Sequence, residues 1–104
     1  MKPVRLDDEA QAEIDAAVSW YDVNAETVVV GDQFLAEIEQ ALERIAENPA
    51  AFSLTTGVPA ELGARRCLLH RFPFAVVFLE LPQEIRVVAL AHHRRRPGYW
   101  RPRL

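Results

Sequence analysis

The chain has 104 residues, 50% of them hydrophobic and 26% charged, a composition typical of one soluble globular domain over residues 1–104 with a single core. It has no apolar run of the roughly 18 residues that cross a membrane and no signal peptide, which predicts a cytoplasmic protein without membrane contact. The single cysteine, Cys67, excludes an internal disulfide and a cysteine-rich metal site, and the formal net charge is −3.

The first half of the chain is predicted to form a short strand and two helices. Residues 2–6 read as the strand, and Asp7 and Asp8 can cap a helix over residues 8–22, in which apolar residues recur at helical spacing. Asn24 is a plausible cap for a second helix, which ends at Asn48-Pro49. Its apolar face is Phe34, Ile38, Leu42 and Ile45, and its glutamates are expected to form a solvated face rather than a metal site. Joined around Val23-Asn24, the two helices make an antiparallel hairpin.

The second half is predicted to form three strands. Residues 48–63 contain two prolines and two glycines and are expected to be a connecting loop. Strands should follow at residues 64–69, 74–81 and 84–91, with a tight turn at Pro82-Gln83. The middle strand is apolar on both faces and is therefore expected to be central. The order β-α-α-β-β-β predicts an α+β fold, a helical hairpin packed on one face of a small, mostly antiparallel sheet whose other face or far end is free for a ligand.

The C-terminal stretch concentrates residues that bind anions. Ile85, Val87 and Ala89 alternate with Arg86, Val88 and Leu90, and the predicted strand then gives way to HHRRRPGYWRPR. Residues 1–62 have a net charge of −10 and residues 63–104 a net charge of +7, and every basic residue of the second part is arginine. Arginine binds phosphates and carboxylates through two parallel hydrogen bonds, so this part is predicted to be a binding face, although a solvated tail is the alternative.

Three segments together resemble the RelE/ParE superfamily of toxins. They are RIAENP at the end of the second helix, RCLLHRFPFAVVF, and the ending VVALAHHRRRPGYWRPR, and they occur in the order and spacing of that family. The resemblance implies a RelE/ParE-like fold and the toxin of a type II toxin–antitoxin pair. It implies a hetero-oligomer in which a cognate antitoxin protein holds the toxin inactive, and it implies no cofactor.

The resemblance leaves two classes of target, the ribosome with its mRNA for RelE-like enzymes and DNA gyrase for ParE-like inhibitors. RelE-like cleavage would use Arg71, His93, Arg95 and Tyr99 for proton transfer and charge stabilisation. His93, however, stands six residues before the tyrosine, where those enzymes have an arginine. Their lysine pair is also missing, because Lys2 is the only lysine. Gyrase is therefore the favoured target, with ribosome-dependent mRNA cleavage as the alternative.

A second set of residues is predicted to contact the target or the antitoxin. Two of its members have another possible role. His92 could instead hydrogen-bond the helical hairpin, and Trp100 could, with Tyr99, pack over the sheet edge rather than stack on a base. A plain nucleic-acid-binding module ranks last, because Phe74 and Phe78 look buried. The set comprises Arg65, Arg66, His92, Arg94, Arg96, Trp100 and Arg101.

Overall fold

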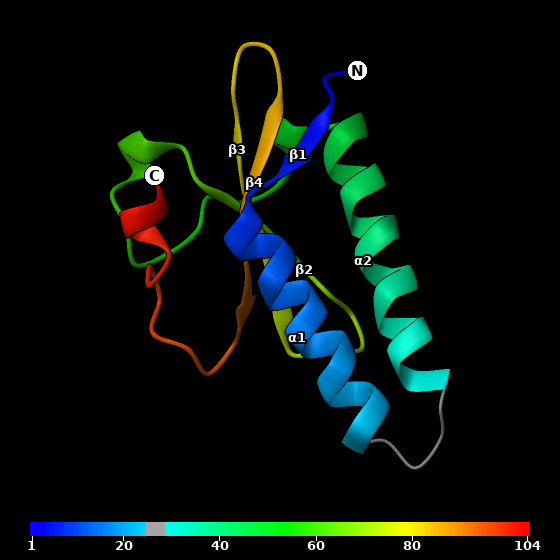
Figure 1. The fold of residues 1–104 in the computed structure, drawn as a ribbon. Helices are drawn as coiled ribbons and strands as arrows, with labels where there is room; N and C mark the ends of the chain where they lie inside the picture. Colours follow the sequence, from blue (N-terminus) through cyan, green and yellow to red (C-terminus); the bar gives the residue numbers. More distant parts are fainter. Residues whose placement is uncertain (25–28) are drawn as a thin grey trace.

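The computed structural model describes residues 1–24 and 29–104, and it has the predicted element order (Figure 1). The sheet has the strand order β1-β4-β3-β2, in which β1 runs parallel to β4 and the other neighbours are antiparallel. The predicted α+β fold with a mostly antiparallel sheet and a central β3 is therefore confirmed. The elements are β1 (Val4–Leu6), α1 (Asp8–Asn24), α2 (Val29–Glu47), β2 (Arg65–Leu68), β3 (Phe74–Glu80) and β4 (Ile85–His92).

The helix boundaries differ from the prediction at the hairpin. Asn24 is the last residue of α1 and not a cap of the second helix, because its side-chain amide donates to the Trp20 carbonyl at 2.9 Å. The predicted link around Val23-Asn24 is therefore wrong. The chain between the two helices, residues 25–28, lies outside the described residues.

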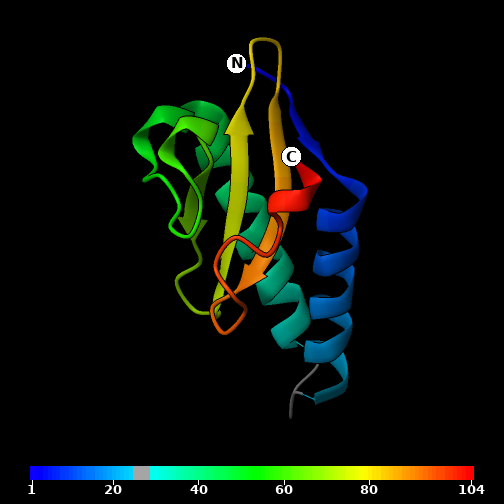
Figure 2. The ribbon, with the colours of Figure 1, turned by 90° about the vertical axis from the view of Figure 1, so that its left-hand side faces the viewer.

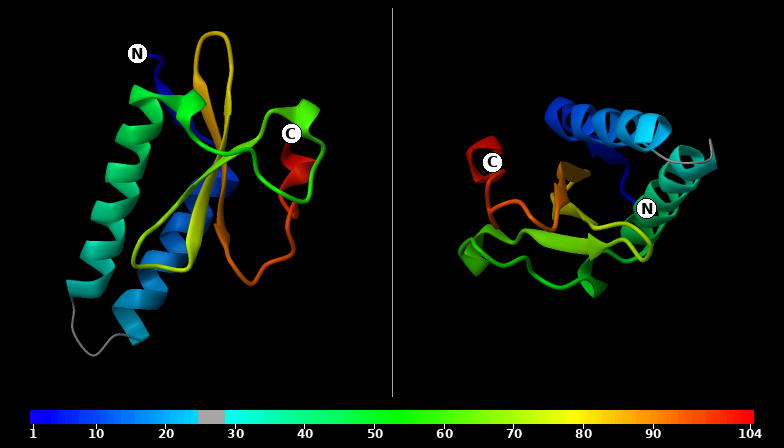
Figure 3. Two further views of the ribbon diagram at one scale, coloured as in Figure 1. Left: turned by 180° about the vertical axis from the view of Figure 1, so that it is seen from behind. Right: turned by 90° about the horizontal axis from the view of Figure 1, so that it is seen from below.

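Both helices cover one face of the sheet, and α2 and the C-terminal turn lie on opposite sides of it (Figures 2 and 3). Phe34 is the centre of an aromatic group, with Tyr21 and Phe72 rings 5.1 and 4.9 Å away. The wider helix-facing core is the larger of two groups of buried apolar residues. It includes Ala10, Ile14, Ile38, Ile45, Val76, Phe78, Val87 and Leu90.

A β-bulge in β4 changes which residues face the helices. Val77 pairs with Ala89 while Phe78 pairs with Val87, so Val88 is an extra residue. Val88 and Ala89 therefore both lie on the face away from the helices, and Leu90 joins the helix-facing core. The predicted simple alternation through Ala89 is wrong, because the bulge shifts the pattern by one residue.

The face away from the helices is covered by the end of the chain. Trp100 is 2% exposed and packs with Ala64, Val77, Val88 and Ala89. Of the predicted alternatives, the packed tryptophan is the one present. This face is therefore only partly free for a ligand. In the described part of the chain, no helix is long and apolar enough to cross a membrane.

Candidate functional site

The candidate site lies where the edge of β4 meets α1 and the segment after β4, residues 93–104. β1 pairs with β4 only as far as Val87, so among residues 1–24 and 29–104 no strand neighbours the edge of β4 beyond Val87. Side chains take the place of that strand. Glu13 of α1 accepts a hydrogen bond from the Leu90 N–H at 3.1 Å, and Arg103 donates to the Val88 carbonyl at 2.9 Å. The free strand edge is therefore satisfied by polar side chains from both ends of the chain.

Glu13 also binds three side chains of the C-terminal segment. Its carboxylate accepts from the Tyr99 hydroxyl at 2.5 Å, from Arg103 at 2.8 and 3.1 Å, and from Arg95 at 3.5 Å. The Arg95 guanidinium lies 3.6 Å from the centre of the Tyr99 ring, a cation–π contact. One carboxylate thus connects α1, β4 and the segment after β4.

The Tyr99 hydroxyl is held in a part-buried hydrogen bond to Glu13. Burial, and then the hydrogen bond to the Glu13 carboxylate, raise the pKa of the Tyr99 phenol well above its ordinary value. Such a phenol stays protonated at neutral pH and keeps its proton for the hydrogen bond to Glu13.

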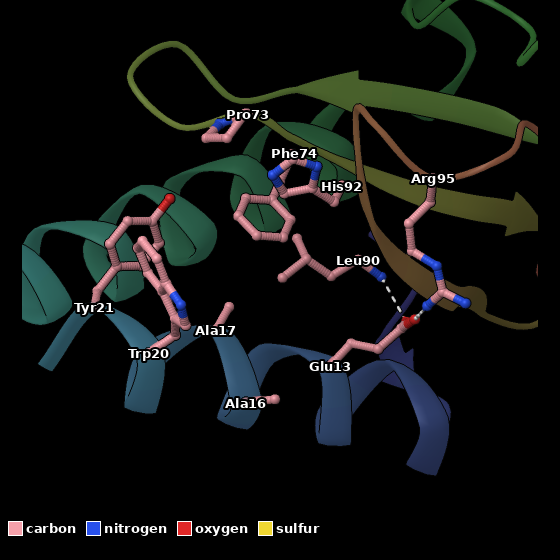
Figure 4. Close-up of a pocket in the computed structure, with 10 residues that line it drawn as sticks. All are labelled: Glu13, Ala16, Ala17, Trp20, Tyr21, Pro73, Phe74, Leu90, His92 and Arg95. Atoms are coloured by element: carbon pink, nitrogen blue, oxygen red, sulfur yellow. Dashed lines mark hydrogen bonds and ion pairs between the residues drawn. The ribbon is translucent and has the colours of Figure 1, made fainter. Parts of the chain in front are cut away.

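An apolar groove of about 500 Å³ begins beside Glu13 and runs between α1 and the end of β4 (Figure 4). Trp20 stands on its α1 side and is 59% exposed, an unusual exposure for so large an apolar side chain. The His92 ring meets the Phe74 ring edge to face at 5.0 Å on the opposite side. The groove is lined by Glu13, Ala16, Ala17, Trp20, Tyr21, Pro73, Phe74, Leu90, His92 and Arg95.

A second depression, of about 320 Å³, lies on the other side of His92 and is more polar. It brings Arg66 of β2 together with His93 and Arg96 of the segment after β4. Thr55, Thr56, Arg95 and Tyr99 also line it. Cationic and hydroxyl groups around one hollow are suited to an anionic partner.

Close contact between two loops fixes the arginine-rich segment. Gly57 (φ 84°) and Gly98 (φ 80°) both have backbone conformations that favour glycine. A Cβ on Gly57 would lie 2.6 Å from the Pro97 Cβ, and one on Gly98 would lie 2.8 Å from the Gly57 carbonyl oxygen. The loop before β2 thereby supports the turn that follows Arg96.

Arg71 lies apart from this site, in the turn between β2 and β3. It forms an ion pair with Glu37 of α2 at 3.4 Å, and Glu37 also accepts hydrogen bonds from the backbone N–H groups of His70 and Arg71. Burial alone would raise the pKa of the Glu37 carboxyl, but these donors outweigh it and the pKa lies below its ordinary value. Glu37 is 5% exposed, so the predicted fully solvated glutamate face is wrong at this position.

The structure thus brings three of the four residues predicted for catalysis to one depression and holds the fourth, Arg71, elsewhere. His93, Arg95 and Tyr99 line the second depression, where the Tyr99 hydroxyl is bound to Glu13, and Arg71 is held by Glu37 in the turn between β2 and β3. Among the residues predicted for binding, Arg65 donates to the Phe52 carbonyl at 2.5 Å and the His92 ring accepts from the Arg94 N–H at 3.0 Å.

Several arginines remain available to a partner. Within residues 1–24 and 29–104, the arginines beyond residue 62 that form no ion pair are Arg65, Arg66, Arg94, Arg96 and Arg101. In the same ranges, no group of three metal-binding side chains comes together.

The sequence reasoning missed Glu13 and Arg103. Glu13 was one of many acids in the first helix, and its own position carried no distinctive signal. The opposite charges of the two halves were the available clue, because Arg71, Arg86, Arg95 and Arg103 of the second half pair with acids of the first. Part of the predicted +7 face is therefore neutralised inside the molecule.

Comparisons with known proteins point to one family. A family model described as the ParE toxin of the type II toxin–antitoxin system parDE matches residues 4–97. A solved structure of a chromosomal ParDE toxin–antitoxin system from P. aeruginosa is similar in fold, with a TM-score of 0.74 at 20% identity, and the match covers 88% of this chain and 96% of that one. A comparison with curated proteins gives no match.

Proposed function

Because the chain belongs to the ParE toxin family of type II toxin–antitoxin systems, we propose that it arrests growth by binding DNA gyrase and performs no nucleic-acid chemistry of its own. Family membership makes the chain a type II toxin whose partner is an antitoxin protein. The choice of gyrase over the ribosome is the proposal. It depends on how the candidate catalytic residues are used.

The observation that carries the proposal is the hydrogen bond from the Tyr99 hydroxyl to Glu13. Metal-free RNA cleavage needs a base for the 2′-OH, a cation for the phosphorane charge and an acid for the leaving oxygen. The Tyr99 hydroxyl is bound to Glu13 and Arg71 is paired with Glu37, which leaves, among the four predicted catalytic residues, His93 as the one unbound group for proton transfer and Arg95, itself in contact with Glu13, for the charge. A protein-binding inhibitor needs only a charged and shaped surface.

The arginines without ion pairs supply that surface in our proposal. Arg94 and Arg96 are exposed in the segment after β4, and Arg66 of β2 lines the second depression together with Arg96. Arg95 is 54% exposed although it contacts Glu13. Trp100 would act indirectly, because it is buried beneath this segment and supports its shape.

We assign the apolar groove to the antitoxin. Trp20, Tyr21 and Phe74 offer apolar surface to an amphipathic segment, and Arg95 stands at the groove end for an acidic side chain of that segment. Binding along α1 and the edge of β4 would then cover the basic segment as well. The interface would exceed the standard size of about 1,600 Å².

The test compares two assays on purified toxin: supercoiling of relaxed plasmid by gyrase, and cleavage of a defined mRNA on translating ribosomes. We expect the wild-type toxin to inhibit supercoiling and to leave the mRNA intact. Tyr99→Phe should inhibit as well as the wild type, and Arg96→Ala should inhibit about tenfold less. Arg5→Ala, a change of an exposed arginine of β1, is the matched control and should inhibit like the wild type.

The opposite pattern would overturn the proposal. Positioned mRNA cuts that disappear in His93→Ala or Tyr99→Phe, with gyrase unaffected, would identify a ribosome-dependent nuclease. The depression that contains Arg66 and His93 would then be the RNA site.

A further inference from the structure

We propose that Glu13 is a positioning residue, which holds Arg95 and the segment after β4 in the shape that recognises the target. The inference rests on the proposed function in that it takes this segment to be the target-binding surface. Glu13 itself is not expected to touch the target, because its side chain is 17% exposed and lies beneath Arg95 and Arg103.

The contacts of Glu13 divide into an anchored part and an adjustable part. Arg103 is 16% exposed, is bound at 2.8 Å, and also donates to the Val88 carbonyl. Arg95 is 54% exposed and its contact with Glu13 is longer, at 3.5 Å. The anchored contacts fix the carboxylate in place, and the fixed carboxylate then orients the exposed guanidinium.

Tyr99 completes the support from the other side. The Arg95 guanidinium lies over the Tyr99 ring at 3.6 Å, so a ring and a carboxylate bracket it. The Tyr99 hydroxyl also donates to Glu13, so the two supports of Arg95 contact each other. An arginine free in water samples many rotamers, and restricting it beforehand lowers the entropy that binding must overcome.

Glu13 and Arg95 also line the groove that we assign to the antitoxin. An acidic group entering there would compete with Glu13 for Arg95 and move it away from its target-binding orientation. The contact between Glu13 and Arg95 would therefore support target recognition in the free toxin and would be broken when the antitoxin binds.

The experiment is a double-mutant cycle with Glu13→Gln, Arg95→Ala and the double variant in the full chain. Gyrase inhibition, growth arrest after expression, and thermal unfolding are measured for all three and for the wild type. Each single variant should inhibit about tenfold less, and the double variant should be no weaker than Arg95→Ala alone. The lowering of Tm by Glu13→Gln should be the same with and without Arg95→Ala, because it arises from Arg103 and Tyr99.

Arg5→Gln is the matched control, because Arg5 is 53% exposed and ion-paired at the other end of β4. It should leave inhibition and growth arrest unchanged. Should Glu13→Gln fail to fold, Glu13→Asp takes its place in the cycle, since it keeps the charge but withdraws it from Arg95.

Two results would overturn the inference: wild-type inhibition by the Glu13 variant, or single effects that multiply in the double variant. The first would show that the contact is irrelevant to the target, and the second that Glu13 acts through overall stability. A wild-type toxin that arrests growth without inhibiting gyrase would refute the gyrase proposal instead. The cycle measured by growth arrest would still decide the role of Glu13.

Discussion

Glu37 and Glu13 lie on the two helices of one hairpin, and each accepts several hydrogen bonds, but their partners differ. Glu37 binds the backbone N–H groups of His70 and Arg71 in the turn between β2 and β3. Glu13 binds mostly side chains of the segment after β4. A carboxylate that binds backbone groups fixes the path of the chain, whereas one that binds side chains fixes the shape of a surface. We therefore expect Glu37 to act on stability and Glu13 on recognition.

The largest effect should come from removing what anchors the Glu13 region to the sheet. Trp100→Ala should lower the free energy of unfolding by about 3–5 kcal/mol, because it leaves a cavity over Val77, Val88 and Ala89. Chemical denaturation measures this loss. Trp20→Ala is the control, since Trp20 is 59% exposed in the groove and should cost about 1 kcal/mol or less. Equal losses for the two tryptophans would mean that the C-terminal segment is not anchored by Trp100.

Glu37→Gln tests whether Glu37 acts on stability and not on target recognition. The amide cannot reproduce a charged acceptor for two N–H groups and Arg71 in a site that is 5% exposed, so we expect a loss of about 2–3 kcal/mol. Gyrase inhibition per folded molecule should not change. Glu39→Gln, an exposed position on the same helix, is the control and should be nearly neutral. A stable Glu37→Gln variant with weakened inhibition would reverse the roles assigned to the two glutamates.

Periodicity predicted most of the fold, because the strands and the helix faces follow the burial of apolar residues. At the majority of their ends, the predicted strands differ from the observed ones by about one residue or less. The resemblance of three segments identified the family correctly. The bulge at Val88 could not be predicted, since every residue from Val87 to Ala91 is apolar and either register buries them.

The site was harder to predict, because its geometry joins segments that are distant in the sequence. Glu13 and Tyr99 are 86 positions apart, and no local pattern marks either as the partner of the other. The sequence supplied the arginines, and the fold decided which of them pair internally. Arg95 and Arg96 are neighbours with the same chemistry, yet only Arg95 contacts Glu13 in the described structure.

A smaller effect should follow from disturbing the loop that supports the basic segment. Gly57→Ala should cost about 2 kcal/mol, because it adds backbone strain at φ 84° and a clash with Pro97. Gly63→Ala has the same kind of strain, at φ 69°, but the added Cβ would have no atom within 4 Å apart from those of its chain neighbours, so about 1 kcal/mol is expected. Only Gly57→Ala should also weaken gyrase inhibition, because it displaces the turn after Arg96. Equal effects of both variants on inhibition would show that this loop contact does not shape the surface.

The smallest predicted effect is a dependence of stability on acid pH that separates Glu37 from its exposed neighbours. The pKa of Glu37 lies below its unfolded value of 4.5, and a hydrogen bond from Arg86 likewise lowers the pKa of Asp7 below 3.8. Each carboxylate therefore contributes stability that is fully present above its unfolded pKa and is lost as the pH falls through its folded pKa. Denaturation at a series of pH values from 7 downwards, at constant ionic strength, should show a decline beginning near these unfolded values. The decline should be shallower in Glu37→Gln, which has no carboxylate to protonate at that position, and unchanged in Glu39→Gln. A parallel decline in both variants would mean that the donors around Glu37 do not favour its ionised form.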